Sequence, residues 1–225
     1  MCYFKKVMAM ALALAMILSA SLVAFAAGSP ATAPTVDYVD NNTESHIGKQ
    51  VDSTFEGSNV TVNTVESTEG EKNVNFKTAT NAEGKKVAIT TVGNGKTGIF
   101  NSDAGRIIRL VRINSKAKKV TVKAKAFTGS KVSKVRIDSK KVQINKNAFY
   151  KTKTKNPTIY IVGSKKKASA FTFKKGAFAG LSSKAKIIVN TSTMTKSEFA
   201  KFKKAAKAAG FKGTIVRQKV NTSKL

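Results

Sequence analysis

The segment VTVKAKAF, residues 120–127, returns in the same frame as VQINKNAF at 142–149 and as FTFKKGAF at 171–178. In each copy two apolar residues flank a polar one, and an Ala-Phe pair closes the segment. A short apolar alternation with a period of two is typical of a β-strand. About ten residues after each Phe a further apolar alternation follows, at 135–137, 159–161 and 185–189. We interpret these segments as units of an internal repeat.

A fainter copy precedes the three units. Phe100 is followed by Ile108-Arg-Leu110, with the step of ten residues that also links Phe127 to Ile137. The four repeat phenylalanines are 27, 22 and 29 residues apart. A unit of this length cannot bury its own apolar face and must stack on its neighbours, which predicts a solenoid of short stacked β-strands joined by turns or short helical turns. The side chains expected in its shared core are Phe100, Phe127, Phe149 and Phe178.

The segment after Val189 predicts an amphipathic α-helix. Thr195 and Glu198 have the spacing of a capping box, in which each side chain satisfies a backbone N–H of the other, and Gly210 predicts the left-handed stop. Apolar residues recur at helical spacing in this segment, at Phe199, Phe202, Ala206 and Ala209. A basic amphipathic helix can lie on an anionic membrane, but we favour a cap that closes the open end of the solenoid.

These residues resemble the bacterial leucine-rich repeats of the BspA type, found in surface and secreted proteins. The segments that carry the resemblance are KNAF at 146–149, KGAFAG at 175–180, SKAKIIV at 183–189 and the helix at 196–210. The resemblance covers about residues 84–216 and implies a leucine-rich-repeat solenoid with roles in adhesion or host contact, without fixing a ligand. The sequence departs from the pattern after Ala-Phe, where Thr-Gly or Tyr-Lys stands, and at 152–156, which we interpret as a loop insertion.

The N-terminal part predicts export. Residues 1–26 have a charged start, an apolar stretch from Val7 to Val23 and an Ala-Phe-Ala cleavage pattern at 24–26, as in a signal peptide. The alternative is an uncleaved anchor, since the apolar stretch is nearly long enough to span a bilayer. We expect no other contact with a membrane and a secreted or cell-surface location.

The remaining sequence divides into three parts. Residues 27–71 are rich in Thr, Asn and Ser and predict a flexible spacer, 72–194 the repeat array, and 195–225 the capping helix with a final strand. Within the array, the alternations at 74–76 and 87–89 flank Asn81-Ala-Glu-Gly84 and predict a hairpin at its N-terminal end.

Charge is distributed unevenly along the chain. Residues 27–98 hold nine acidic and six basic side chains, whereas residues 99–225 hold three acidic and thirty-three basic ones. Such a field attracts polyanions. The partners expected are wall teichoic acid, acidic or sulfated glycans, or a host surface protein; specific nucleic-acid binding is not expected, because no nucleic-acid-binding signature is present.

Two rows of side chains are the candidate contacts for such a partner. The residue between two core positions of a strand points away from the core, which predicts a row of Arg109, Arg136, Tyr160 and Lys186. A second row is predicted from Lys123, Lys125, Asn145 and Lys174. The alternative is a solvated face without a ligand.

Catalytic groups are scarce in the sequence. The repeat half offers three carboxylates, Asp103, Asp138 and Glu198, and the single histidine, His46, lies in the predicted spacer. The only cysteine is Cys2, ahead of the apolar stretch. The segment Gly93-Asn-Gly-Lys-Thr97 lacks the first glycine of a phosphate-binding loop and predicts a polar turn. We therefore expect no enzyme, no cofactor and no metal site.

The function expected is that of a non-catalytic recognition or adhesion module. Two alternatives remain open. The first is a structural repeat protein of the envelope or matrix, held by non-specific charge. The second is a secreted nucleic-acid-binding protein, which is less favoured.

Overall fold

The computed structural model describes residues 35–225 apart from 41–42, 49–50, 66–71, 82–83 and 101. The predicted signal peptide, residues 1–26, lies outside the described residues. The elements below belong to one unit, residues 33–225. Among the described residues, no helix is long and apolar enough to cross a membrane.

One sheet has six strands, and all of its pairings are parallel. Its order is β15 (Thr214–Gln218), β14 (Lys186–Asn190), β12 (Thr158–Ile161), β10 (Lys134–Ile137), β8 (Leu110–Ile113) and β5 (Asn73–Phe76). Apart from β5, these are the strands that follow the repeat phenylalanines, together with the final strand.

The second sheet has nine strands and is mixed. Its main path is β13 (Phe171–Phe173), β11 (Val142–Ile144), β9 (Val120–Val122), β7 (Lys86–Val92), β6 (Thr78–Thr80), β1 (Thr35–Asp40) and β2 (Thr43–Gly48). β4 (Asn59–Val65) pairs with β7, and β3 (Val51–Glu56) pairs with β4. The pairings from β7 to β13 are parallel and carry the repeat.

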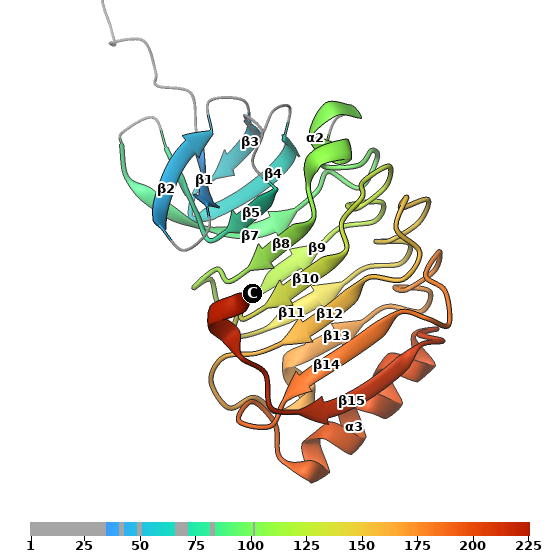
Figure 1. Ribbon diagram of the computed structural model, residues 1–225. Helices are drawn as coiled ribbons and strands as arrows, with labels where there is room; N and C mark the ends of the chain where they lie inside the picture. Colours follow the sequence, from blue (N-terminus) through green and yellow to red (C-terminus); the bar gives the residue numbers. More distant parts are fainter. Residues whose placement is uncertain (1–34, 41–42, 49–50, 66–71, 82–83, 101) are drawn as a thin grey trace, which may run out of the picture. The chain divides into compact units, whose positions relative to one another are not determined.

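From β8 to β14 the chain alternates between the two sheets, so the fold is β-rich and repeat-like (Figure 1). A strand of the six-stranded sheet leads through a short loop to a strand of the nine-stranded sheet, and a turn with the Ala-Phe pair leads back. In the part of the chain that the structure describes, the helices are α2 (Ser102–Ile107), α3 (Lys196–Ala208) and the short 3₁₀ turns η1 (Ala168–Ala170) and η2 (Thr222–Lys224).

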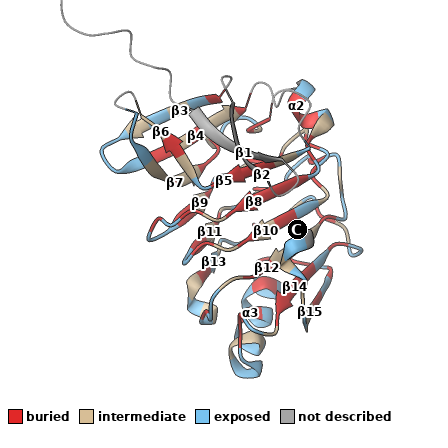
Figure 2. Ribbon diagram, turned by 60° about the vertical axis from the view of Figure 1, so that its left-hand side comes forward, coloured by how far each residue is buried: buried red, intermediate tan, exposed pale blue. Residues whose placement is uncertain are grey.

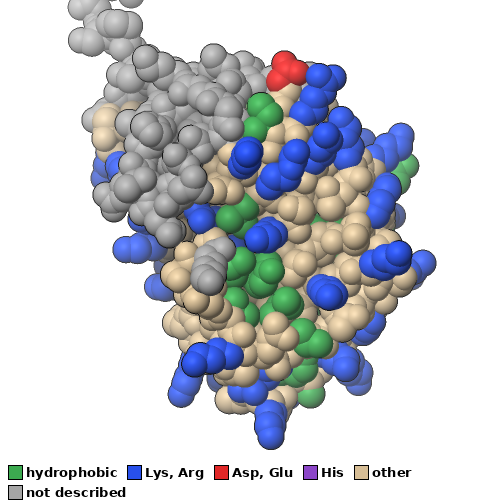
Figure 3. Space-filling view, in the orientation of Figure 1, with side chains coloured by type: hydrophobic (Ala, Val, Ile, Leu, Met, Phe, Trp, Pro, Cys, Tyr) green, Lys and Arg blue, Asp and Glu red, His purple; other side chains and the backbone are tan. Residues whose placement is uncertain are grey.

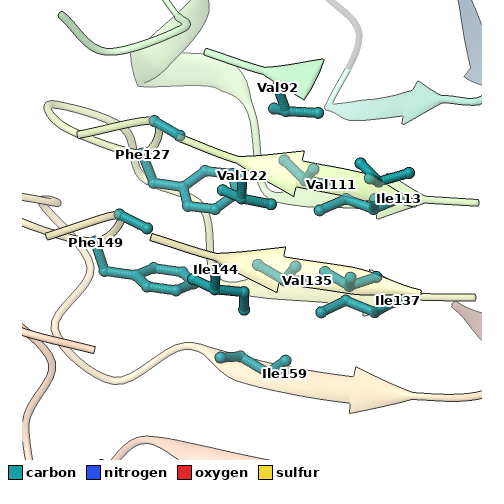
Figure 4. Close-up of a cluster of buried hydrophobic side chains, with 14 of the residues drawn as sticks. Val92, Val111, Ile113, Val122, Phe127, Val135, Ile137, Ile144, Phe149 and Ile159 are labelled. Atoms are coloured by element: carbon teal, nitrogen blue, oxygen red, sulfur yellow. The ribbon is translucent and has the colours of Figure 1, made fainter. Parts of the chain in front are cut away.

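The core lies between the two sheets, and the repeat phenylalanines are stacked within it. Figure 2 shows the buried residues concentrated on the strands, and Figure 4 shows Phe127 and Phe149 packed beside Val122, Ile144 and Val135. The ring centroids of Phe127 and Phe149 are 4.9 Å apart, and those of Phe149 and Phe178 are 6.2 Å apart. All four repeat phenylalanines are at most 5% exposed. Phe127, Phe149 and Phe178 thus form one stacked column, and Phe100 is buried in the same core.

The prediction of a flexible spacer over residues 27–71 is wrong for the strands β1, β2, β3 and β4. The last two span residues 51–65. They form the antiparallel pair β3 and β4, in which Val51, Val60, Val62 and Val65 are buried. Three of the nine polar side chains in this segment belong to Thr, whose β-branched side chain favours strands. The Val alternation within it supplies the buried face.

The hairpin around 81–84 exists, but its first strand is not the one expected. β6 and β7 pair antiparallel, and Asn81 and Gly84 close the turn with a backbone hydrogen bond of 3.0 Å. The strand at 73–76 pairs instead with β8 in the other sheet. Sequence alternation marked both segments as strands but could not assign the partner of either.

α3 covers the β13 end of the nine-stranded sheet. Phe202 is buried and meets Phe171 and Phe173 edge-on, with centroids 5.2 and 5.5 Å apart. At the start of the helix, Thr195 accepts a hydrogen bond from the backbone N–H of Glu198 at 3.3 Å. At its end, Gly210 has a φ of +93°. The helix therefore protects an edge that would otherwise be open.

The capping box is only half formed. The Glu198 carboxylate accepts from the backbone N–H of Ala168 at 2.6 Å and from Lys201 Nζ at 3.1 Å, and no bond to Thr195 is seen among the described contacts. The prediction of a reciprocal box is wrong because the preceding 3₁₀ turn brings a free N–H closer to this carboxylate. Glu198 thereby ties α3 to the last repeat.

Candidate functional site

The first predicted row is only half correct. Strand register places Arg112, Arg136, Tyr160 and Ile188 at equivalent positions in β8, β10, β12 and β14. Arg136 and Tyr160 therefore share a row, but Arg109 and Lys186 do not belong to it. Arg109 precedes β8, and Lys186 is aligned with Lys134 and Thr158. The apolar pattern of 107–113 fits two registers, which explains the error.

Arg109 instead terminates α2. Its NH1 group donates to the backbone carbonyls of Arg106, Ile107 and Ile108 at 2.6, 2.9 and 3.1 Å. A cation at the last carbonyls of a helix satisfies acceptors that have no partner within the helix. The structure thus gives this guanidinium a structural role.

The chain's own C-terminal segment returns to β8 and β10 (Figure 1) and contacts Arg112 and Arg136, which we call the arginine row. Arg112 Nε donates to the main-chain oxygen of Leu225 at 3.0 Å, and Arg136 NH1 donates to those of Thr222 and Leu225 at 3.2 and 3.1 Å. Arg112 is 8% exposed and Leu225 7% exposed. Burial first, and the charge of Arg136 second, lower the pKa of the Arg112 guanidinium. The row is therefore occupied and is not an open cationic ladder.

The second predicted row is formed by three of its four members. The backbone N–H groups of Lys123, Asn145 and Lys174 bond to the last residue of the neighbouring strand, at 2.9, 3.0 and 3.0 Å. These residues are consequently aligned just beyond β9, β11 and β13. Lys123 and Lys174 are exposed.

Lys125 lies in a different row, aligned with Asn147 and Gly176. The three residues are linked by backbone hydrogen bonds of 2.9 Å and have φ values of +59°, +62° and +76°. They form the left-handed corner of the Ala-Phe turn, where Asn and Gly are favoured. The prediction placed Lys125 wrongly because the strand ends before the corner.

Lysines gather instead on the loops that leave the six-stranded sheet. These lysine loops are NSKAKK at 114–119 after β8, DSKK at 138–141 after β10, and VGSKKK at 162–167 after β12. Because the strands before them are parallel neighbours, successive loops lie about one strand spacing of ~4.8 Å apart. The fold thus converts three separate lysine runs into one basic edge.

Three hollows run along this edge. The central hollow, of about 700 Å³, is lined by Lys118, Lys140, Lys141 and Lys165–Lys167 with Ser164, Ser169 and Ala170. A second hollow of about 700 Å³ shares Lys118 with it and adds Lys119 and Lys123. A third, of about 540 Å³, shares Lys165–Lys167 and adds Arg217 and residues 191–195, of which all but Met194 carry a hydroxyl group. Because neighbouring hollows share walls, we treat them as one lysine groove.

The groove is strongly cationic. Nine basic side chains line it, against two acidic ones, Glu56 and Glu198. Glu198 is already engaged by Ala168 and Lys201. The wider surface is also basic: on the face drawn in Figure 3, Lys and Arg side chains are spread widely, whereas acidic ones occur at one place. A concave surface of one sign focuses the field and concentrates counter-ions.

Lys166 forms the floor of the groove. Its side chain is 3% exposed, and its Nζ donates to the carbonyls of Val162 and Ser164 at 3.0 and 3.2 Å. Its Nζ also lies 3.8 Å from Asp138, which in turn pairs with Arg136 at 3.3 Å. Burial lowers the pKa of Lys166, and Asp138 opposes that shift. The ammonium of Lys166 therefore holds the loop together, while those of Lys165 and Lys167 stay exposed.

Sequence reasoning missed Arg112 and the lysine loops. A signal for the loops is present, because each contains a Ser-Lys pair that begins within three residues of the last residue of a strand: Ile113, Ile137 and Ile161. The signal is hidden by composition, since lysine is frequent throughout the repeat half. Only the parallel register shows that these particular runs are neighbours.

Within the part of the chain that the structure describes, no group of three or more His, Cys, Asp or Glu residues is placed to hold a metal ion. Comparison with known proteins finds no matching family model, no matching curated protein and no matching solved structure. The argument for function therefore rests on the geometry of the groove and on the sequence itself.

Proposed function

We propose that this protein is an exported, non-catalytic recognition module that binds anionic polymers at the cell surface through its lysine groove. The observation that carries the proposal is the junction of three hollows lined by nine basic and two acidic side chains. Wall teichoic acid and acidic or sulfated glycans are the polymers that such a site would meet outside a cell. A host surface protein with an acidic patch is the second candidate partner.

The fold that we propose for this module is a leucine-rich-repeat solenoid of the BspA type. Three features support it: the alternation of the chain between two parallel stacks, the Ala-Phe turn in each unit, and the helix over the β13 edge. Stacked units of this kind present their loops in register. That register is what brings the lysine loops together.

Export is the second part of the proposal. The apolar stretch from Val7 to Val23, followed by Ala24-Phe-Ala26, supports a secretory signal. A basic groove would then meet the polyanions of the wall or of a host surface. A protein held there by charge needs no covalent anchor.

A generic tether is the competing account. The outer face of α3 also carries exposed lysines, Lys201, Lys203, Lys204 and Lys207, and any of them attracts a polyanion non-specifically. In a recognition site, the lysines of the groove contribute more to binding affinity than equally exposed lysines elsewhere on the surface. In a generic tether, both sets contribute equally. Charge-matched substitutions separate the two accounts.

The test compares Lys140→Gln/Lys141→Gln in the groove with Lys203→Gln/Lys204→Gln on α3, in the chain from residue 27 to 225. All four lysines are exposed, and both variants lose two charges. Binding is measured for wall teichoic acid, a sulfated glycosaminoglycan and duplex DNA at physiological salt. We expect the groove variant to lose about tenfold in affinity for its preferred polymer, while the α3 variant changes by less than twofold. Equal losses for every polymer in both variants would leave only the generic tether.

A further inference from the structure

The groove runs across the strands rather than along them. Its three hollows follow one another through shared walls, first at Lys118 and then at Lys165–Lys167. The loops that line the central and third hollows follow β8, β10, β12 and β14, which are successive neighbours in the sheet, and the remaining hollow is lined mainly by β4, β7 and β9. Three strand spacings amount to about 14 Å. A ligand that touches all of these loops must therefore be an extended chain that crosses the repeats.

The charges offered by the groove are ammonium groups, not guanidinium forks. Arg217 is the one arginine among the described lining residues, and its Nε and NH2 groups donate to the carbonyls of Met194 and Thr191 at 2.7 and 2.8 Å. The exposed lysines provide compact charges on flexible stems. Such groups follow a string of tetrahedral oxyanions without demanding a fixed planar geometry.

Hydroxyl groups line the two ends of the groove. The hollow beside β7 and β9 includes Thr61, Thr91 and Thr121, which are half-buried. The hollow beside α3 includes Thr191 and the exposed Ser192. Hydroxyls that donate and accept match the hydroxyls of a sugar or polyol backbone.

Aromatic side chains are absent from the described residues that line the groove. Single-stranded nucleic acid is typically held by bases stacked on aromatic rings, and this surface offers no such platform. Duplex DNA carries its phosphates on a rod that is stiff over about 50 nm, so it meets the rims of a concave surface but cannot adapt to its hollows. The lining therefore favours a flexible chain without aromatic bases.

We propose that the lysine groove takes one flexible chain whose hydroxylated backbone carries sulfate or phosphate esters, threaded across the repeats from Lys118 to Lys167. This inference rests on the proposed function and adds its ligand class and orientation. Sulfated glycans and polyol phosphates share the chemistry. A short fragment fills only part of the groove, whereas a chain that spans it engages every loop at once.

The experiment is a length series. Heparin-derived oligosaccharides from the disaccharide to the decasaccharide form one arm, and glycerol phosphate oligomers of matched charge form the other. Affinity for the full exported chain is measured by calorimetry at fixed salt. In at least one arm we expect affinity to rise at least tenfold with length and then to level off once the groove is spanned. The series in which affinity rises and then levels off identifies the ligand as a sulfated glycan or as a polyol phosphate.

Substitutions at the two ends test the orientation. Lys118→Gln and Lys167→Gln each remove an exposed charge at one end of the central hollow. We expect each substitution to lower the affinity for long oligomers at least threefold. For the shortest oligomer, which cannot reach both lysines, we expect at most one of the two substitutions to lower the affinity. Lys203→Gln on α3 is the control and should have no effect at any length.

Two negative outcomes are distinguishable. If the groove substitutions weaken binding but affinity does not depend on length in either arm, or if duplex DNA competes through the same lysines, the threaded chain is overturned and the groove remains a site. If Lys118→Gln and Lys167→Gln act no more strongly than Lys203→Gln, the proposed function falls as well. Thermal unfolding of each variant verifies that the fold is retained.

Discussion

Single residues fix the geometry of the lysine loops. Gly163 has a φ of +90°, and a Cβ placed on it would lie 1.6 Å from Asp138 Oδ1. Asp138 is the carboxylate that faces both Arg136 and the buried Lys166. A side chain at 163 would therefore displace the ion pairs beneath the groove. Glycine is required here for space as well as for backbone conformation.

We expect Gly163→Ala to lower the free energy of unfolding by about 2–4 kcal/mol, through strain and the displaced Asp138. The matched control is Gly57→Ala, because Gly57 also has a positive φ of +57° but nothing within 4 Å of the added carbon. The control should cost only about 1–2 kcal/mol. Urea denaturation measures both values, and an equal loss in the two variants would contradict the role given to Asp138.

Elements are joined by a few specific side chains. Glu198 links α3 to the last repeat through the backbone N–H of Ala168, and the arginine row holds the C-terminal segment on the six-stranded sheet. These contacts close two surfaces of the array. Each of these two contacts can be tested separately.

The link made by Glu198 should depend on pH. The hydrogen bond from Ala168, and after it that from Lys201, lower the pKa of Glu198 from its ordinary 4.5. Just below pH 4.5, Glu198 therefore binds more protons in the unfolded chain than in the folded one. The stabilisation by the ionised Glu198 is fully present above pH 4.5 and is lost as the pH falls through the pKa of the folded state. We expect Glu198→Gln to be less stable than the wild type at pH 7 and the difference to shrink at pH 3.

Asp103→Asn is the control for Glu198→Gln. Asp103 lies 3.9 Å from Arg106, and both side chains are largely exposed, an arrangement that contributes little. Urea denaturation at the two pH values compares the variants. A Glu198→Gln difference that stays constant between pH 7 and pH 3 would contradict the link to Ala168.

Removal of the C-terminal segment, residues 219–225, distinguishes the arginine row from the groove. The deletion uncovers Arg112 and Arg136, which hold the segment through main-chain oxygens. We expect a loss of about 1–3 kcal/mol in stability, since the three hydrogen bonds from Arg112 and Arg136, the bond from the Val220 N–H to Asn190 and the buried Leu225 side chain are lost. Polyanion affinity that depends on Lys140 and Lys141 should remain. If the deletion abolished that affinity, the binding site would include the C-terminal segment.

At the scale of the whole molecule, the repeat and its buried phenylalanines could be predicted from the sequence, but the pairing of the strands could not. The repeat phenylalanines were found because their frame recurs and their burial follows from it. The sequence predicts Arg109 in the row where the structure places Arg112, because the apolar alternation continues through both positions. The strands at 51–65 were missed because their Thr-rich composition outweighed the Val alternation.

The lysine groove exists because the parallel strands of the six-stranded sheet are paired in register. Lys118, Lys140 and Lys167 are far apart in the sequence and become neighbours only because their strands are parallel and in step. Charge asymmetry alone predicted an affinity for polyanions but not where they bind. A lysine-rich repeat protein without aligned loops would carry the same net charge with no preferred binding site.

The salt dependence of binding tests this account most directly. A contact between a lysine and a polyanion releases counter-ions, and each lost contact reduces the slope of log K against log salt by about one. We expect Lys140→Gln/Lys141→Gln to reduce that slope by about two for the preferred polymer, and Lys203→Gln/Lys204→Gln to leave it unchanged. If both pairs reduced the slope equally, the lysines of the groove would act no differently from the rest of the surface, which would contradict the assignment of the site.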